Sequence, residues 1–123
     1  MTDFIITIDL HNQDVEQALA IVDAEIRRLR KVPARFKALK CIHGYTRGSR
    51  IAKALHAHLK RLETDGTIAA WVRGTEWNIH NARLLDLIAA VHLKDGNLFL
   101  SSDPDFSREN PGITVAIIWA HSS

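Results

Sequence analysis

Cysteine is nearly absent from this chain, because Cys41 is the one cysteine among 123 residues. No disulfide can form within the chain, which excludes the small disulfide-stapled scaffolds of secreted proteins. Long apolar runs are also missing, since no stretch approaches the roughly 20 apolar residues of a membrane-spanning helix. The first residues lack the basic start of a signal peptide. Together these absences predict a soluble protein of the cytoplasm.

Acidic residues are missing from one part of the chain. None of the 14 acidic residues lies between positions 26 and 62, whereas 12 of the 16 basic residues do. They are Arg27, Arg28, Arg30, Lys31, Arg35, Lys37, Lys40, Arg47, Arg50, Lys53, Lys60 and Arg61. A positive segment on a negative body favours a polyanionic partner, because a surface built only for solubility mixes both signs. The alternative is a solvated basic face that binds nothing.

The order of apolar patterns predicts an α/β fold. Short β-branched runs alternate with segments whose apolar residues recur at helical spacing. Strands are expected at 4–10, 37–43, 67–73 and 113–120, with helices between the first three and a further helix at 82–93. This order predicts a single domain over residues 1–123: a two-layer α/β sandwich with a βαβαββ mixed four-stranded sheet. Residues 74–110 form an extra helical excursion before the last strand.

Polar side chains follow the first two expected strands. A helix joins these strands, so they should be parallel, and their carboxyl ends should meet at one edge of the sheet. Asp9 and His11 stand at the end of the first strand and His43 at the end of the second. These three residues are the candidate catalytic set for acid–base chemistry on a phosphodiester. Asp9 and His11 are also the candidate ligands for a divalent metal such as Mg²⁺.

The loop after His43 has the composition of a phosphate-binding turn. Its glycines permit close approach of the backbone, and free amides at a helix start attract anions. The arginines add planar forks suited to phosphate oxygens, and a tyrosine offers a stacking surface for a base. The candidate binding residues here are Gly44, Tyr45, Arg47, Gly48, Ser49, Arg50 and Lys53. The end of the first helix and residues 35–40 would extend this positive surface.

Each of these features also has a plain structural interpretation. A single histidine at a strand end is usually a satisfied polar residue, and Asp9 could cap the following helix, as Asn12 or Asp14 could. The other histidines show no metal-ligand spacing. Cys41 is expected in the core. Trp71, Trp77 and Trp119 are expected in core or rim packing rather than as stacking platforms for bases.

Three short motifs, taken together, resemble the small MutS-related (Smr) family. Ile8-Asp9-Leu10-His11 is similar to its strand-end DLH element, and Ile42–Gly48 to its HGxG-type loop. Asn110-Pro111-Gly112-Ile113-Thr114-Val115 is similar to the NPG-x-T turn before its last strand. The resemblance covers about residues 4–73 and 108–120. It implies a βαβαββ fold similar to the C-terminal domain of a bacterial translation initiation factor.

The resemblance also implies nucleic-acid binding, DNA nicking or RNA cleavage, in some members aided by a divalent metal. It gives functional positions to Asp9, His11, His43 and Gly44, and backbone-contact or structural positions to Gly48, Gly112 and Thr114. Asn12 departs from the family pattern, because many members have glycine there. We therefore expect a domain that binds RNA or DNA and acts as an endonuclease. The alternatives are a non-catalytic nucleic-acid-binding module and a protein-interaction domain that uses residues 74–110.

Overall fold

The computed structural model describes residues 4–34, 36–44, 49–78, 80–90 and 100–118. Along the chain the elements are β1 (Phe4–Asp9), α1 (Val15–Arg30), β2 (Lys37–Ile42), α2 (Ser49–Thr64), β3 (Ala70–Arg73), the 3-10 turn η1 (Gly74–Glu76), α3 (Ala82–Ala90) and β4 (Ile113–Ile118). None of the described helices is long and apolar enough to cross a membrane.

The four strands form one mixed sheet in the order β1-β2-β4-β3. β1 pairs with β2 in parallel, and β4 pairs antiparallel with both β2 and β3. The last strand of the chain therefore lies between β2 and β3, which run in the same direction. This arrangement confirms the predicted mixed four-stranded α/β sandwich, and it leaves β1 and β3 as the two edge strands.

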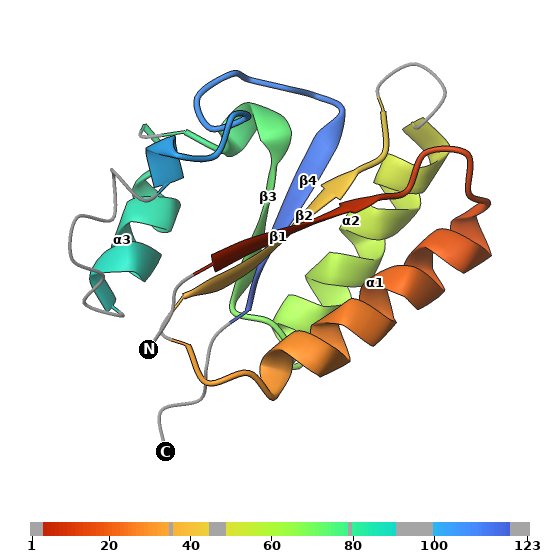
Figure 1. Ribbon diagram of the computed structural model, residues 1–123, viewed down its shortest axis with the longest axis horizontal. Coiled ribbons are helices and arrows are strands. Elements are labelled where there is room, and N and C mark those ends of the chain that lie inside the picture. The colour runs from red at the N-terminus through yellow and green to blue at the C-terminus, as the bar shows by residue number, and fades with distance from the viewer. Residues whose placement is uncertain (1–3, 35, 45–48, 79, 91–99, 119–123) are drawn as a thin grey trace.

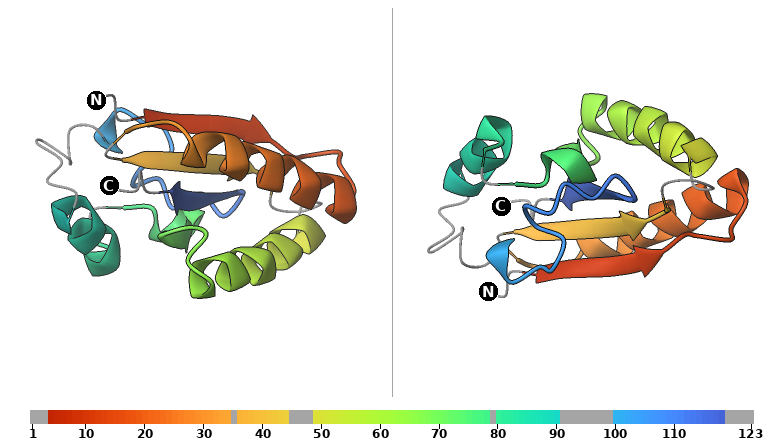
Figure 2. Two further views of the ribbon diagram at one scale, coloured as in Figure 1. Left: turned by 90° about the horizontal axis from the view of Figure 1, so that it is seen from below. Right: turned by 90° about the horizontal axis from the view of Figure 1, so that it is seen from above.

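Each face of the sheet has its own apolar core. On one face, α1 and α2 cover Leu39, Cys41, Ala116 and their neighbours. On the other face, Trp77, α3 and the segment around Leu100 and Phe106 cover the alternate strand residues. Figures 1 and 2 show α1 and α2 on one side of the sheet and α3 on the other. The described part of the excursion thus covers the second face of the sheet.

The two ends of α1 are both capped. Asp14 is the N-cap, and its carboxylate accepts the amide of Gln17 at 2.7 Å while Gln17 returns a bond to the Asp14 amide. At the other end, the buried ammonium of Lys37 donates to the carbonyls of Leu29 and Val32. A cation at this end of a helix complements the partial negative charge of its last carbonyls. Of the two predicted caps, Asp14 takes the role, and Asn12 instead adopts a left-handed turn with φ 68°.

A buried ion pair fastens the excursion to the sheet. Lys40 of β2 donates to Asp103 at 2.6 Å and to Asp105 at 2.7 Å, and its side chain is only 4% exposed. Asp103 also accepts the indole N–H of the buried Trp77 at 2.9 Å. Burial alone would lower the pKa of Lys40, but its two carboxylate partners raise it. Neither Lys37 nor Lys40 therefore belongs to the positive surface that the sequence predicted for residues 35–40.

Some predicted boundaries differ from the observed ones. β3 begins at Ala70 rather than at residue 67, because the amides of Thr67 and Ile68 bond back to the Leu62 carbonyl of α2. Ser49, a candidate binding residue, is the first residue of α2. The sequence also indicates a short strand at 97–100; residues 97–99 lie outside the described residues, and Leu100 is buried.

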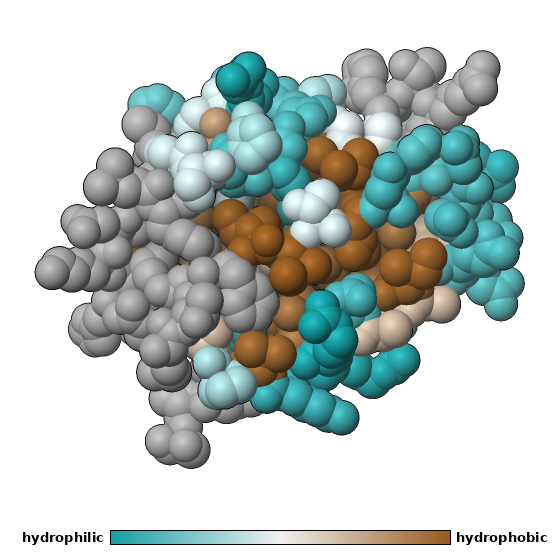
Figure 3. Space-filling view, in the orientation of Figure 1, coloured by the Kyte–Doolittle hydropathy of each residue, from teal (hydrophilic) through white to brown (hydrophobic). Residues whose placement is uncertain are grey.

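β1 is less covered than its continuous apolar sequence predicts. Ile5, Ile6 and Ile8 are only partly buried, since β1 is an edge strand. Figure 3, in the orientation of Figure 1, shows apolar surface in the middle of this face, over β1.

Replacing Lys40 with methionine should destabilise the fold. The substitution leaves the buried Asp103 without its cation, and breaking a buried pair in this way costs about 3–5 kcal/mol. Thermal or urea unfolding measures the loss. Lys60→Met is the matched control, because Lys60 is exposed and should change stability by less than about 0.5 kcal/mol. Equal stability of the two variants would contradict the structural role of the pair.

Candidate functional site

The carboxyl ends of β1 and β2 border a cleft of about 490 Å³, which we call the His11 cleft. It is lined by His11, Asn12, Gln13, Ile42, His43, Gly44 and Ile51. In the β1–β2 register Asp9 lies opposite Ile42, so the polar residues after the two strands meet at one edge of the sheet. The parallel pairing thus brings His11 and His43 to the same cleft, as the sequence predicted. Asp9 is joined to this cleft through its bond to His11.

Asp9 and His11 form an exposed pair. The carboxylate of Asp9 accepts the backbone amide of His11 at 3.0 Å and also bonds to the Nδ1 of its ring. The hydrogen bond from the His11 ring, followed by the one from its amide, lowers the pKa of Asp9. An ionised Asp9 keeps the proton of neutral His11 on Nδ1 and leaves a lone pair on Nε2. The His11 side chain is 58% exposed, and no hydrogen bond joins its Nε2 to a described residue.

His43 is in a different state, because both of its ring nitrogens are engaged. The residue is only 2% exposed. Its Nδ1 donates to the carbonyl of Gly44 at 2.8 Å, and its Nε2 lies 2.9 Å from the Thr114 hydroxyl. A carbonyl can only accept, so the Nδ1 carries the proton. This ring holds the cleft in shape rather than offering a free nitrogen to a ligand.

The Thr114 hydroxyl also bonds to a second histidine, which lies on α2. His56 Nε2 is 2.8 Å from Thr114 Oγ1. With both rings neutral, the hydroxyl accepts from His56 and donates its one proton to His43. The result is a directed chain from His56 through Thr114 and His43 to the Gly44 carbonyl. Burial, followed by the charge of Arg73, lowers the pKa of His56 to about 4.

The turn before β4 completes this arrangement. The carbonyl of Gly112 accepts the amides of His43 and Gly44, each at 3.0 Å. Asn110 holds the turn, because its side-chain oxygen accepts the Gly112 amide at 2.8 Å and its nitrogen donates to Asp105 at 3.1 Å. Gly44 has φ +82°, a conformation that favours glycine. The second and third motifs of the sequence are thus bonded to each other.

The remaining predicted binding residues are only partly described. Tyr45, Arg47 and Gly48 lie outside the described residues. Ser49, Arg50 and Lys53 are in the first turns of α2, where Arg50 and Lys53 are exposed and make no ion pair within the described part of the chain. Ile51 of the same turn lines the His11 cleft. Of the predicted anion site, the structure therefore describes the start of α2 with the exposed cations Arg50 and Lys53.

A metal would find few ligands at this cleft. Nowhere in the described residues do three or more His, Cys, Asp or Glu side chains gather in a way that could hold a metal ion. Asp9 and His11 are bonded to each other, which leaves one carboxylate oxygen of Asp9 without a described partner. Mg²⁺ is often held by one or two carboxylates together with substrate phosphates and water. The donor set suits such a loosely held ion and does not form a closed metal cage.

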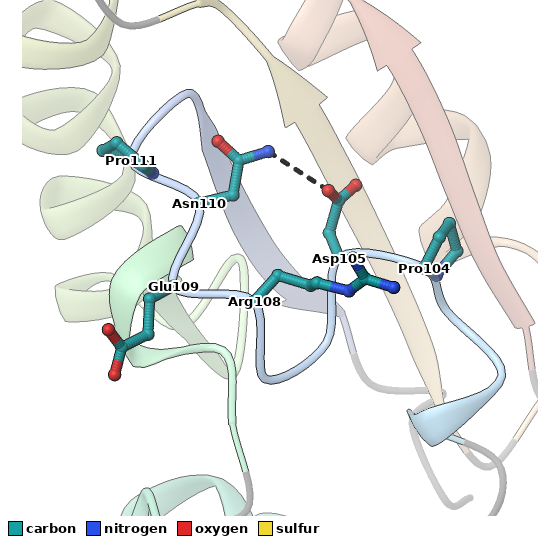
Figure 4. A pocket seen from close by; sticks show the side chains of 6 residues that line it. All are labelled: Pro104, Asp105, Arg108, Glu109, Asn110 and Pro111. Atoms are coloured by element: carbon teal, nitrogen blue, oxygen red, sulfur yellow. Dashed lines mark hydrogen bonds between the residues drawn. The ribbon is translucent and has the colours of Figure 1, made fainter.

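Another hollow, lined by the loop from Pro104 to Pro111, contains none of the predicted site residues (Figure 4). Asn110 and Asp105, two of the polar residues that line it, are bonded to each other, and Asp105 also binds Lys40. The loop thus serves to support the turn before β4.

Sequence reasoning missed His56 and Asn110. His56 stands three residues before Leu59 of the buried stripe of α2, and residues three apart share a helix face, so a signal for its inward position was present. Thr114 gave a second signal, since it is the one hydroxyl residue in the otherwise aliphatic β4 and a buried hydroxyl needs a partner. The predicted core positions of Cys41 and Trp77 are confirmed. Trp119 lies outside the described residues.

Comparison of the chain with protein-family models, with curated proteins and with solved structures finds no match. The resemblance to the Smr family thus depends on the three motifs alone.

The depressed pKa of His56 predicts a stability that falls in mild acid. The folded protein keeps His56 neutral down to about pH 4, whereas the unfolded chain binds a proton near pH 6.5. Between these values the unfolded state holds more protons, so stability falls as the pH falls, and above pH 6.5 this loss is absent. His56→Gln keeps an N–H donor but cannot titrate.

Urea unfolding between pH 7 and pH 4.5 measures this effect. The slope of stability against pH should flatten in His56→Gln and stay unchanged in His80→Gln, which alters an exposed histidine. An unchanged slope in His56→Gln would show that His56 is protonated in the folded protein.

Proposed function

We propose that this chain is an Smr-like nucleic-acid-binding domain that cleaves a phosphodiester bond at the His11 cleft. The observation that carries the proposal is the Asp9–His11 pair, which presents a free imidazole nitrogen at the cleft. A carboxylate that orients a histidine in this way is a common arrangement for general base catalysis.

The chemistry follows from the free Nε2 of His11. This nitrogen takes the proton of the attacking hydroxyl, which is a water molecule or a ribose 2′-hydroxyl. The new phosphorus–oxygen bond forms as the bond to the leaving oxygen breaks, and the imidazolium returns its proton to that oxygen. Asp9 stabilises the imidazolium in between. A bound divalent ion would add charge stabilisation at the phosphate.

The other residues hold and position the substrate in this proposal. Arg50 and Lys53 bind phosphates beside the amides at the start of α2. His43 and Thr114 act as positioning residues, since their polar atoms are engaged with Gly44 and His56. His43 was expected in the catalytic set, and its burial favours this supporting role instead.

Asp9→Asn and His11→Gln should abolish cutting and spare binding. Loss of a general base typically costs 10²–10⁴-fold in rate. Supercoiled DNA and a structured RNA are incubated with each variant, with Mg²⁺ or with EDTA, while binding is measured in parallel. Asp65→Asn is the matched control, because Asp65 is another exposed carboxylate that accepts a backbone amide two residues on, from Thr67, without a histidine.

The results separate three cases. If only wild type and Asp65→Asn cut the nucleic acid, the proposal is supported. If this cutting persists in EDTA, His11 acts without a metal. If every variant binds in a salt-sensitive way and none cuts, the domain is a non-catalytic binding module. The bonded ring nitrogens of His43 favour this alternative. Absence of binding refutes the nucleic-acid proposal altogether.

Binding should weaken steeply with salt, because phosphate neutralisation releases counterions. Each phosphate contact contributes a slope of about one in a plot of log affinity against log salt. The double variant Arg50→Ala/Lys53→Ala should therefore lower that slope by about two. Arg108→Ala is the control, since Arg108 is exposed on the excursion, which covers the opposite face of the sheet from α2. Equal slopes for wild type and the double variant would remove α2 from the binding surface.

A further inference from the structure

A second cleft, of about 580 Å³, lies between α2 and β3 and is called the Trp71 cleft here. Its wall on α2 includes His56, Lys60 and Glu63. Trp71 and Arg73 of β3 form the opposite wall, and Arg83 of α3 also lines it. The cleft combines an aromatic ring with three cations, and none of the sequence motifs points to it.

The carboxylates of this cleft are committed to the protein. Glu63 accepts the Trp71 amide at 3.2 Å and also bonds to Arg83. Glu76 accepts the Arg73 amide at 3.2 Å. Both amides bond to carboxylates instead of to β4, so they lie on the open edge of β3. The two glutamates occupy these donors and thereby prevent a further strand from pairing with β3. The groups left for a ligand are the Trp71 ring and the free cations.

Three cations without an ion-pair partner among the described residues lie along this side of the molecule. Arg50, Lys53 and Lys60 are exposed and make no ion pair within the described residues. At 100° per residue they share one face of α2, and at 1.5 Å per residue they span about 15 Å. By contrast, Arg28 and Lys40 are paired with carboxylates. These three cations extend from the first turn of α2, where Ile51 lines the His11 cleft, to Lys60, which lines the Trp71 cleft.

The Trp71 ring is held in place before any ligand binds. His56 stacks on it with ring centroids 4.9 Å apart and an interplanar angle of 22°. His56 is itself bonded to Thr114, so the ring is coupled to the residues behind the His11 cleft. The guanidinium carbon of Arg73 lies over the ring, 5.9 Å from its centroid, at the outer limit of a cation–π contact. Trp71 is half-buried, so part of the ring still faces the cleft.

We propose that the Trp71 cleft is a second subsite, which binds an unpaired base and its phosphate from a single-stranded nucleic acid. The strand runs from the His11 cleft along the free cations of α2, and a base stacks on Trp71 while Arg73 and Lys60 bind phosphate. A duplex cannot use the subsite, because its bases are already stacked on one another. This inference rests on the proposed function and narrows its substrate to unpaired segments.

The test compares three variants, Trp71→Leu, Arg73→Ala and Lys60→Ala, with Arg108→Ala as the charge-matched control. The probes are a 12-nucleotide oligo-U, an oligo-dT of the same length and a 12-base-pair duplex. Loss of one stacking platform or phosphate contact should weaken single-strand binding about tenfold. Duplex binding should change little in Arg73→Ala and Lys60→Ala. The thermal midpoint should change little in Lys60→Ala, because the Lys60 side chain is exposed. In Trp71→Phe, quenching of tryptophan fluorescence by the oligonucleotide should be smaller than in wild type.

The outcomes distinguish this subsite from the site on which it depends. Selective single-strand loss in the cleft variants supports the subsite, and a difference between oligo-U and oligo-dT tells which sugar is preferred. If wild type binds none of the three probes, the proposed function itself fails. If wild type binds but the cleft variants match Arg108→Ala, or lose duplex binding equally, the subsite alone is refuted.

Discussion

One backbone carbonyl, that of Gly112, holds the candidate site together. It accepts the amides of His43 and Gly44, so the turn before the last strand fixes the end of β2. Two residues later, Thr114 bonds to His43 and His56 and thereby adds α2 to the same junction. No buried side-chain nitrogen or oxygen is left without a hydrogen bond in the described residues, which is the condition under which such a polar junction stabilises a fold.

Charge in the sequence and charge on the surface are different quantities in this protein. The segment without acidic residues contains Lys37 and Lys40, and both are buried. One neutralises the carbonyl end of α1, and the other neutralises two carboxylates that lie more than sixty residues away in the sequence. The positive surface is therefore smaller than the composition indicated and lies mainly on α2 and at the end of α1. Folding has separated the cations that need a protein partner from those that remain free.

Much of the fold was predictable, since periodicity marks buried faces and Asp14 marks a helix start. The meeting of His11 and His43 followed from parallel pairing. The roles of His43 and His56 did not follow, because they depend on a contact with Thr114 that joins residues far apart in the sequence. The same holds for Lys40, whose partners stand in a loop of low regularity. Local pattern therefore predicts which elements form, whereas tertiary contacts decide which polar groups stay available for chemistry.

The position of β4 in the sheet has a consequence for synthesis. This strand is the last described element of the chain, yet it lies between β2 and β3 and supplies the only pairing that β3 has within the described sheet. Until residues 113–118 leave the ribosome, the sheet can contain no more than the β1–β2 pair, and both cores lack their central strand. Long-range pairing of this kind is slow, and apolar surface stays exposed until the strands have paired. The domain therefore stays incompletely folded, and open to chaperones, until β4 has been synthesised.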